Sequence, residues 1–390
     1  MPMGAPGPTV NLLDRHIFKS TLATCAAAVG IFAFVLMTGN VVRDLIGPGL
    51  SGQLSAEAFG RLVLLLVPFV FSYALPMGML TGVLLTLGRL SADSEVTAMR
   101  AAGISLPRIA RPVIILGALG FLAGLPVNFE FMPRARVQYD RELTAAVRAN
   151  PLSFIVPKTF IRDFPGVVVY VGEKQGARLR DFWLWRLDGD HRVTQFIRAA
   201  SGRVEYDEAT NDFIITLSQA QVETRSDRNP EDFTEAQPVM TFAQSDPVRL
   251  SLNRLFGRTG IRQKPTWMTY AELRREQARL AAEKVPPGRR KENAQAQMKV
   301  ALVIEDKFNT ALAALTFAVV GVPLGIKVSR RETSANLGVA VLLALGYYLL
   351  TVMIGWLDRH PEYRPDLLLW LPNAVFLLLG AWLFSRIERR

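Results

Sequence analysis

Six long stretches of almost uninterrupted apolar residues constrain what this chain of 390 residues can fold into. A helix needs roughly 20 such residues to cross the hydrocarbon core of a bilayer, where lipid offers no partner to free backbone groups. Charged side chains occur only at the ends of these stretches. We therefore predict a membrane protein with six spanning helices, at Phe18–Val42, Leu62–Leu87, Ile109–Phe129, Phe308–Ile326, Leu337–Leu357 and Leu367–Phe384.

The long segment between the third and fourth apolar stretches has a different pattern. Short runs of β-branched and aromatic residues alternate there with turn-forming groups such as Asp188-Gly189-Asp190. Parallel strands would need intervening helices, which this segment lacks, so we expect an antiparallel sandwich or jelly roll. The predicted strands are Val167–Val171, Phe182–Leu187, Arg192–Ile197, Arg203–Tyr206, Phe213–Leu217 and Val239–Phe242.

The lysine and arginine residues predict the orientation of the helices. Basic residues near the ends of spanning helices mark cytoplasmic loops. Here they precede the first stretch, lie between the second and third, and follow the fourth and the sixth. Both termini are then cytoplasmic, and the β segment lies outside the cytoplasm. The net charge of +11 is spread along the chain instead of forming one stripe, so we predict no binding to nucleic acid.

These patterns divide the chain into four parts. After the β segment, Thr269 followed by Glu272 predicts a capping box at the start of a helix, and a second helical run, Asn293–Lys307, leads into the fourth span. The parts are an N-terminal transmembrane half (1–131), a β domain (132–265), a helical connector (266–307) and a C-terminal transmembrane half (308–390).

Signatures of catalysis are absent from the sequence. The three histidines, His16, His191 and His360, are far apart, and no HExxH or GxSxG pattern occurs. Cys25 is the single cysteine, which excludes an intrachain disulfide or a CxxC metal site. Gly321–Lys327 lacks the spacing of a phosphate-binding loop. We therefore predict a non-catalytic chain with no metal site and no cofactor of its own.

Pairs of glycines lie four residues apart in three of the apolar stretches. Glycine lets the backbones of two helices approach closely, so we expect these pairs to serve helix packing and not ligand binding. They are Gly78, Gly82, Gly120, Gly124, Gly321 and Gly325.

The cytoplasmic segment between the second and third stretches, residues 91–103, predicts a short amphipathic helix. Ser91 or Asp93 can cap its start, and Gly103 can end it. The residues alone leave two interpretations open: a membrane-surface helix that ties two spans together, or a coupling helix that docks in a groove of a separate motor protein. The helix would carry Asp93, Glu95, Met99 and Arg100, with Val96 beside them.

Leu87–Ser105 resembles the loop after the second helix in permeases of the lipopolysaccharide export ABC transporter, the LptF/LptG family. Three further stretches agree: Leu13–His16, Gly321–Ile326, and Leu369–Asn373 with Gly380. The resemblance covers nearly the whole chain, including the order of three helices, a β insert and three helices. Its loop leans toward the LptF-like member.

The resemblance implies a permease subunit of the bacterial inner membrane with a periplasmic β-jellyroll. Such a subunit extracts lipopolysaccharide and passes it to a periplasmic bridge. The implied partners are a paralogous permease, a cytoplasmic ABC ATPase dimer that uses ATP and Mg²⁺, and the periplasmic jellyroll proteins of the bridge.

The resemblance also implies roles for individual residues. Glu95 matches the family's loop glutamate that faces the ATPase, so Asp93, Glu95, Met99 and Arg100 form the implied coupling surface. Arg43 falls on a position that faces the phosphorylated headgroup of the lipid, although an interfacial anchor fits it equally well.

Three other functions compete with lipid export. A secondary transporter would need buried charged residues, which the six stretches lack. An ABC-type mechanotransmitter would transmit force from the cytoplasm to the periplasm without moving lipid through its own cavity. A membrane-anchored envelope sensor or enzyme would carry its site on the β insert. Copurification of an ATPase and a second six-span permease distinguishes export from the carrier and the sensor.

Overall fold

The computed structural model divides the chain into two compact units. The helical unit comprises Met1–Val41, Val63–Tyr139 and Gln263–Arg390, and the sheet unit comprises Val42–Leu62 and Asp140–Arg262. The structure describes residues 12–46, 54–149, 155–162, 166–188, 192–207, 210, 212–225, 239–244, 247–251, 264–283, 286, 290–327, 333–359 and 361–388.

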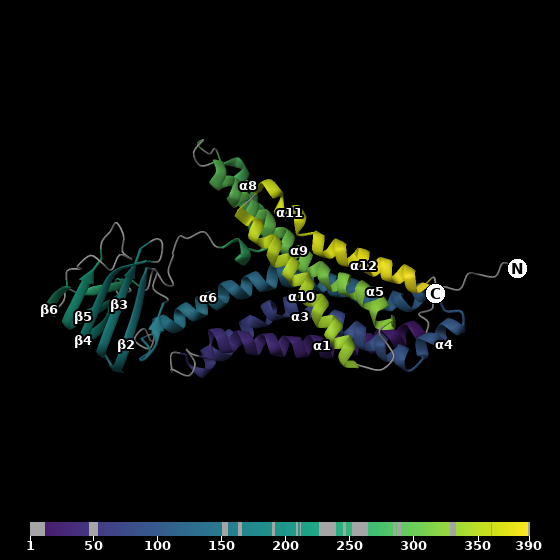
Figure 1. Cartoon of the computed structure of the whole chain (residues 1–390), viewed down its shortest axis with the longest axis horizontal. Helices are drawn as coiled ribbons and strands as arrows, with labels where there is room; N and C mark the ends of the chain where they lie inside the picture. The colour runs from purple at the N-terminus through teal and green to yellow at the C-terminus, as the bar shows by residue number, and fades with distance from the viewer. Residues whose placement is uncertain are drawn as a thin grey trace. The chain divides into compact units, whose positions relative to one another are not determined.

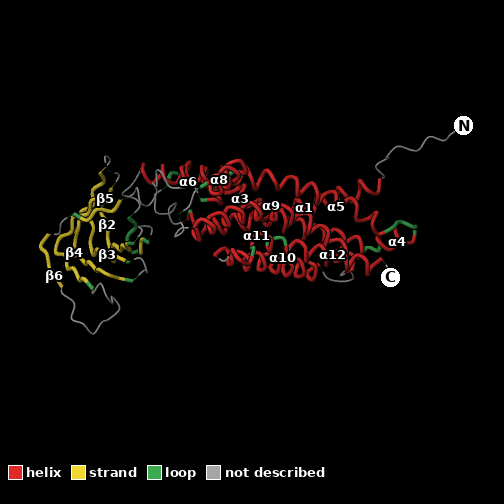
Figure 2. The backbone as a smooth tube through the Cα atoms, turned by 90° about the horizontal axis from the view of Figure 1, so that it is seen from above, coloured by secondary structure: helices red, strands yellow, loops and turns green. Residues whose placement is uncertain are grey.

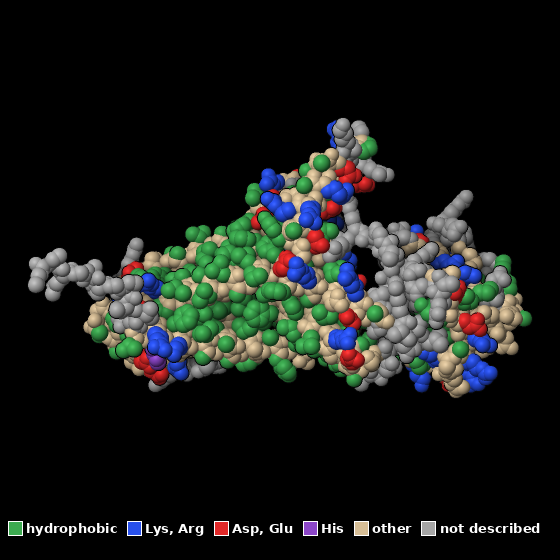
Figure 3. Space-filling model, turned by 180° about the vertical axis from the view of Figure 1, so that it is seen from behind, with side chains coloured by type: hydrophobic (Ala, Val, Ile, Leu, Met, Phe, Trp, Pro, Cys, Tyr) green, Lys and Arg blue, Asp and Glu red, His purple; other side chains and the backbone are tan. Residues whose placement is uncertain are grey.

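Within the described residues, six helical segments are long and apolar enough to cross a membrane. Each predicted stretch overlaps one of them, and Figure 3 shows a broad band of hydrophobic side chains over the helical unit. The helices run side by side in Figure 2. They are α1 (Leu12–Asp44), α3 (Ala56–Ala92), α5 (Leu106–Pro126) with its continuation, α9 (Arg290–Lys327), α10 (Thr333–Gly355) and α12 (Leu371–Glu388), which follows the short α11 (Pro365–Leu368) (Figure 1).

The third helical segment is longer than the sequence predicts. It passes from α5 through a π-helical turn, η1 (Val127–Phe131), into α6 (Met132–Ala149). The turn buries Asn128, whose side chain accepts a hydrogen bond from Ser72 Oγ (2.5 Å) and donates one to the carbonyl of Lys307 (2.9 Å). A π-helical turn inserts an extra residue into a helix. Here that turn carries a polar link from α5 to α3 and α9.

The fourth span and the helical run before it form one helix, α9, as the sequence predicts. This continuity brings a buried lysine to the edge of the apolar segment. Lys307 is 5% exposed, and its Nζ donates hydrogen bonds to the carbonyls of Asn128 and Met268, both at 3.1 Å. Lys307 lies just before the predicted apolar stretch Phe308–Ile326, so the sequence pattern did not predict its burial.

The connector before α9 begins with the predicted capping box. Glu272 Oε2 accepts hydrogen bonds from the backbone N–H of Thr269 (2.8 Å) and from its hydroxyl (2.9 Å). This arrangement starts α8 (Tyr270–Ala282), which packs on α9 through Leu273 and Leu280.

The paired glycines lie at contacts between helices. A Cβ at Gly82 would lie 2.5 Å from the Cα of Cys25, and one at Gly78 would overlap Val29. On α9, a Cβ at Gly321 would lie 2.8 Å from Val83 Cγ1, and one at Gly325 would lie 2.9 Å from Leu87 Cβ. The corresponding contacts of Gly120 and Gly124 are with Ala314 and Ala311, at 3.5 and 3.2 Å.

The sheet unit contains one antiparallel sheet of seven described strands. Consecutive strands pair in the order β1 to β6, and β7 pairs with the first half of β5. The strands are β1 (Phe160–Ile161), β2 (Val167–Gln175), β3 (Arg178–Leu187), β4 (Val193–Asp207), β5 (Asp212–Thr224), β6 (Val239–Gln244) and β7 (Val248–Ser251).

The predicted strands coincide with β2 to β6, with one error. Arg192–Ile197 and Arg203–Tyr206 were predicted as two strands, but they form the single strand β4. The residues between them stay in the ladder, because Ala199, Ser201 and Gly202 all pair with β5. The two-residue β1 and the four-residue β7 are too short to show alternation in the sequence.

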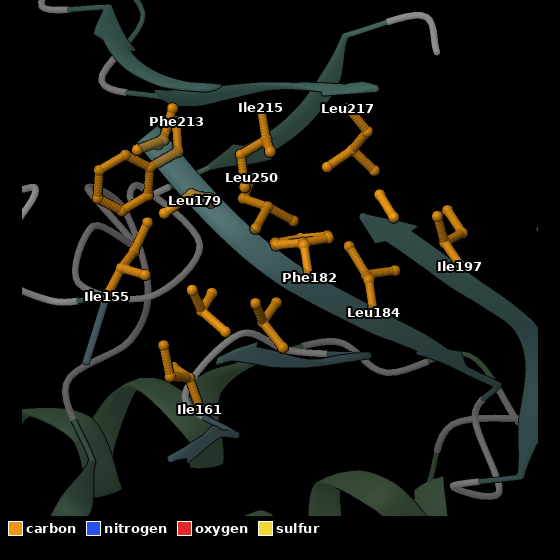
Figure 4. Packing of buried hydrophobic residues seen from close by; sticks show 14 of the residues in the cluster. Ile155, Ile161, Leu179, Phe182, Leu184, Ile197, Phe213, Ile215, Leu217 and Leu250 are labelled. Atoms are coloured by element: carbon orange, nitrogen blue, oxygen red, sulfur yellow. The ribbon is translucent and has the colours of Figure 1, made fainter. Parts of the chain in front are cut away.

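The two faces of the sheet differ in composition. One face carries the aliphatic core shown in Figure 4, where Phe182, Leu184, Phe213 and Ile215 are fully buried. The opposite face carries an aromatic cluster, with ring centroids 5.0–5.9 Å apart between neighbours. Its members are Phe160, Tyr170, Trp183, Trp185 and Phe196, and Arg198 lies over the Trp183 ring.

The contact at Gly82 gives a test of the helix packing. A Gly82→Val substitution should destabilise the helical unit by about 1–3 kcal/mol, because the new side chain must displace the backbone of α1 at Cys25. The matched control is Gly346→Val on α10, where a Cβ meets nothing within 4 Å. Thermal unfolding of the purified chain in detergent should show a lower midpoint for Gly82→Val alone; equal midpoints would contradict the close approach of α1 and α3.

Candidate functional site

A short helix, α4 (Glu95–Ala101), lies at one end of the helical unit, between α3 and α5. The start of α1 and the end of α12 lie at the same end (Figure 1). Two side-chain hydrogen bonds join the helices there: Arg89 Nη2 donates to Ser20 Oγ (2.8 Å), and Ser91 Oγ donates to the carbonyl of Ile326 (3.0 Å). The helices α1, α3 and α9 therefore form one base for α4.

An apolar face attaches α4 to this base. Val96 is 3% exposed and belongs to a hydrophobic cluster with Leu90 and Ile109, from the helices on either side. Met99 and Ile104 pack against the same cluster. Burial of this face fixes α4 to the helices instead of leaving it as a loose loop.

The end of α4 is as predicted. Gly103 has a φ of +82°, which only glycine adopts without strain. Its N–H donates to the carbonyl of Arg100, and the N–H of Ile104 donates to the carbonyl of Met99, both at 3.0 Å. These two bonds form a Schellman motif, with an apolar contact between Ile104 and Met99 on the same cluster.

The predicted start of α4 is wrong. Neither Ser91 nor Asp93 caps it, because α3 continues to Ala92 and the residue before α4 is Ser94, in a left-handed conformation with a φ of 60°. The apolar pattern of α3 extends through Leu90, which is buried, so the helix continues beyond the predicted boundary. The helical part of residues 91–103 is accordingly shorter than the sequence predicts.

The outer surface of α4 combines charge with small side chains. Asp93, Glu95 and Arg100 are exposed, and none of them forms an ion pair with another residue in the described part of the chain. Thr97 and Ala98 are exposed between them. Such a surface can enter a groove of a partner and exchange ion pairs there, while Val96 holds the helix from behind.

Arg43 lies at the last turn of α1 and is 75% exposed. Its guanidinium makes two contacts with the neighbouring carboxylate: Nε donates to Asp44 Oδ1 (2.8 Å), and Nη2 donates to Asp44 Oδ2 (3.3 Å). A phosphate at this position would have to share the guanidinium with Asp44. Asn40, one turn earlier, donates to the carbonyl of Leu36 (2.8 Å).

A second buried polar group lies inside the apolar part of the bundle. Asn373 Nδ2 donates to Asn309 Oδ1 (2.8 Å), and its Oδ1 accepts from Thr316 Oγ1 (2.7 Å). All three residues are at most 3% exposed. Sequence reasoning missed this link between α9 and α12, although single polar residues within apolar stretches signal it. Among the described residues, no group of three or more His, Cys, Asp or Glu could hold a metal ion.

Comparison with known proteins gives a consistent result. The family profile described as "Lipopolysaccharide export system permease LptF/LptG" matches residues 15–386. The LptF permease protein of Escherichia coli (strain K12) is 25% identical over 175 residues, which are 44% of this chain and 47% of that protein. The LptG permease protein of Haemophilus influenzae is 24% identical over 211 residues, 51% of this chain and 56% of that protein. The chain thus spans about half the length of the curated relatives it matches.

The cap of α4 can be tested without touching its surface. A Gly103→Val substitution should destabilise α4 by about 1–2 kcal/mol, because a β-branched residue is strained at positive φ. The matched control is Ala102→Val, at the preceding exposed residue with a φ of −79°. Hydrogen exchange of residues 95–104 in the purified chain should accelerate for Gly103→Val only; unchanged protection would refute the cap.

Proposed function

The chain belongs to the LptF/LptG family of lipopolysaccharide export permeases, and from this premise we propose that it is a permease subunit of an ABC transporter. The transporter extracts lipopolysaccharide from the inner membrane and passes it to a periplasmic bridge. The observation that carries the proposal is α4, a charged helix fixed to the bundle by its apolar face. Of the two paralogous permeases, the sequence of the loop around α4 favours the LptF-like member.

The energy for export comes from a separate cytoplasmic ATPase dimer that binds ATP and Mg²⁺. Extraction exposes acyl chains, at a cost of about 0.8 kcal/mol per CH₂ group, so it needs an external source of work. The groove of the ATPase receives α4, and Glu95 faces it with Asp93 and Arg100 beside it. Met99, also predicted on this surface, packs instead against the bundle behind α4. The buried Val96 supports this role, because it transmits a push on α4 to α3 and α5.

A paralogous permease covers the flank formed by α1 and α10. Only 11% of the apolar window of α1 and 22% of that of α10 is buried, against 67% for α9. Exposed apolar side chains on α10 recur at helical spacing, including Leu342, Leu345 and Leu349. A cavity between the two permeases keeps the acyl chains of the cargo away from water, and the first, second, fifth and sixth spans line it.

The sheet unit is the periplasmic jellyroll that receives the acyl chains. Both termini then lie in the cytoplasm, on the same side as α4. The edge of the sheet supports contact with the next jellyroll protein of the bridge: every residue of β6 is exposed, including Val239 and Met240. Unpaired backbone groups on such an edge can accept a strand from another protein.

Arg43 contributes to binding of the phosphorylated headgroup of the cargo. A guanidinium can form two parallel hydrogen bonds to a phosphate. Arg43 is highly exposed at the end of α1, which supports access by the lipid. On binding, the phosphate would replace Asp44 as the ion-pair partner of the guanidinium.

The coupling role predicts a specific defect. A Glu95→Arg substitution should leave membrane insertion and thermal stability unchanged, because Glu95 is exposed, but should reduce lipopolysaccharide export at least tenfold. It reverses the charge presented to the ATPase. The matched control is Glu57→Arg, another exposed glutamate, at the start of α3 and outside α4.

The measurement is ATP-dependent transfer of labelled lipopolysaccharide from proteoliposomes that contain the copurified complex. Loss of export for Glu95→Arg with normal export for Glu57→Arg supports the assignment. Normal export by Glu95→Arg would show that α4 does not couple the two proteins.

A further inference from the structure

A cavity of about 580 Å³ lies in the helical unit, between α3, α9, α10 and the short turn η3 (Pro265–Trp267). Small-molecule sites typically have volumes of about 300–1,000 Å³. The walls are apolar, from residues such as Leu302, Val303 and Val352, but several polar groups converge inside. Neither the coupling surface nor Arg43 contributes to it.

Three tyrosines form one end of the cavity. Tyr348 lies between the other two, with ring centroids 6.1 Å from Tyr73 and 5.4 Å from Tyr347. The hydroxyl of Tyr347 donates to the carbonyl of Asn309 (3.3 Å), whereas the buried hydroxyl of Tyr348 has no partner among the described residues. A buried hydroxyl without a partner costs free energy, which a bound ligand would recover.

A carboxylate faces the same end. Asp306 lines the cavity, and all three tyrosines lie close enough to interact with its charge. Within the described part of the chain, no group donates a hydrogen bond to Asp306, and the amine of the adjacent Lys307 is directed to the carbonyls of Asn128 and Met268. A carboxylate beside aromatic rings is the arrangement that proteins use to bind an ammonium group.

Two lysines line the cavity away from the end that holds Asp306 and the tyrosines. Lys299 lies on the same face of α9 as Asp306, seven residues earlier, which is about 10 Å along a helix axis. Lys264, the residue before η3, lines the cavity with its Nζ 5.1 Å from the Trp267 ring centroid. The cavity therefore separates a cationic end from an anionic, aromatic end.

The position along α9 restricts the ligand further. Lys299 belongs to the charged first half of the helix, and Asp306 lies two residues before the apolar run that starts at Phe308. The cavity thus straddles the boundary where lipid headgroups meet the hydrocarbon core. Its apolar wall suits the first carbons of an acyl chain.

We propose that this cavity binds a phosphoethanolamine headgroup, with the ammonium between Asp306 and the tyrosines and the phosphate near Lys299 and Lys264. A primary ammonium donates hydrogen bonds that both Asp306 and the Tyr348 hydroxyl can accept, whereas choline has no N–H to donate. An anionic headgroup such as phosphatidylglycerol brings no ammonium to donate to Asp306 or to the Tyr348 hydroxyl. The cavity shares the second and fifth spans with the proposed export path, but it uses neither Arg43 nor α4, so binding of this headgroup can fail while the export function stands.

Native mass spectrometry of the full-length chain in detergent tests the proposal, with added phosphatidylethanolamine, phosphatidylcholine and phosphatidylglycerol of identical acyl chains. We expect phosphatidylethanolamine to bind about tenfold more tightly than the other two lipids. Asp306→Asn should abolish that preference. Tyr348→Phe should weaken it, and because this hydroxyl has no partner in the fold, its loss should leave the thermal stability unchanged.

The matched control is Glu305→Gln, which neutralises the neighbouring acid on α9. Glu305 accepts a hydrogen bond from Trp370 Nε1 (3.0 Å) and does not line the cavity, so this variant should keep the preference. A further arm compares lipid A with and without phosphoethanolamine; tighter binding of the modified form supports the same chemistry from a glycolipid source. Equal binding of all three phospholipids, or equal losses for Asp306→Asn and Glu305→Gln, would overturn the proposal.

Discussion

Lipid offers no hydrogen-bond partner, and this constraint organises the helical unit. A polar side chain placed between the helices is therefore stabilised by a partner inside the protein. Asn128 finds such partners by joining α5 to α3 and α9, and Asn373 does so by joining α12 to α9. Because both links end on α9, this helix is the element against which the others are fixed, in agreement with its high share of buried residues.

The proposed coupling role of α4 depends on its attachment to a well-packed bundle. Glycines at the helix contacts let α3 approach both α1 and α9 closely, so the three helices pack as one body. Val96 then connects α4 to this body through buried contacts, and Gly103 fixes the direction in which the chain enters α5. In the proposed coupling, a force applied to the charged surface of α4 passes to the membrane helices through these buried contacts.

The sequence predicts the parts of this fold that depend on local pattern. Apolar runs locate the spans, Thr269 with Glu272 locates the start of α8, and the helix-ending role of Gly103 follows from its residue type. The extent of α3 and the union of two strands into β4 were not predictable, because neighbouring elements stabilise both. The cavity was missed for a related reason: Tyr73, Asp306 and Tyr348 come from three helices, and no local pattern connects them.

The central claim is that α4 and the sheet unit lie on opposite sides of the membrane. Single cysteines at Thr97 on α4 and at Ser201 on β4 test it directly, because both positions are exposed and the native Cys25 is buried. In intact spheroplasts, a membrane-impermeant maleimide should label the Ser201→Cys variant at once and the Thr97→Cys variant only after the membrane is permeabilised. Labelling of Thr97→Cys before permeabilisation, with Ser201→Cys protected, would contradict the account.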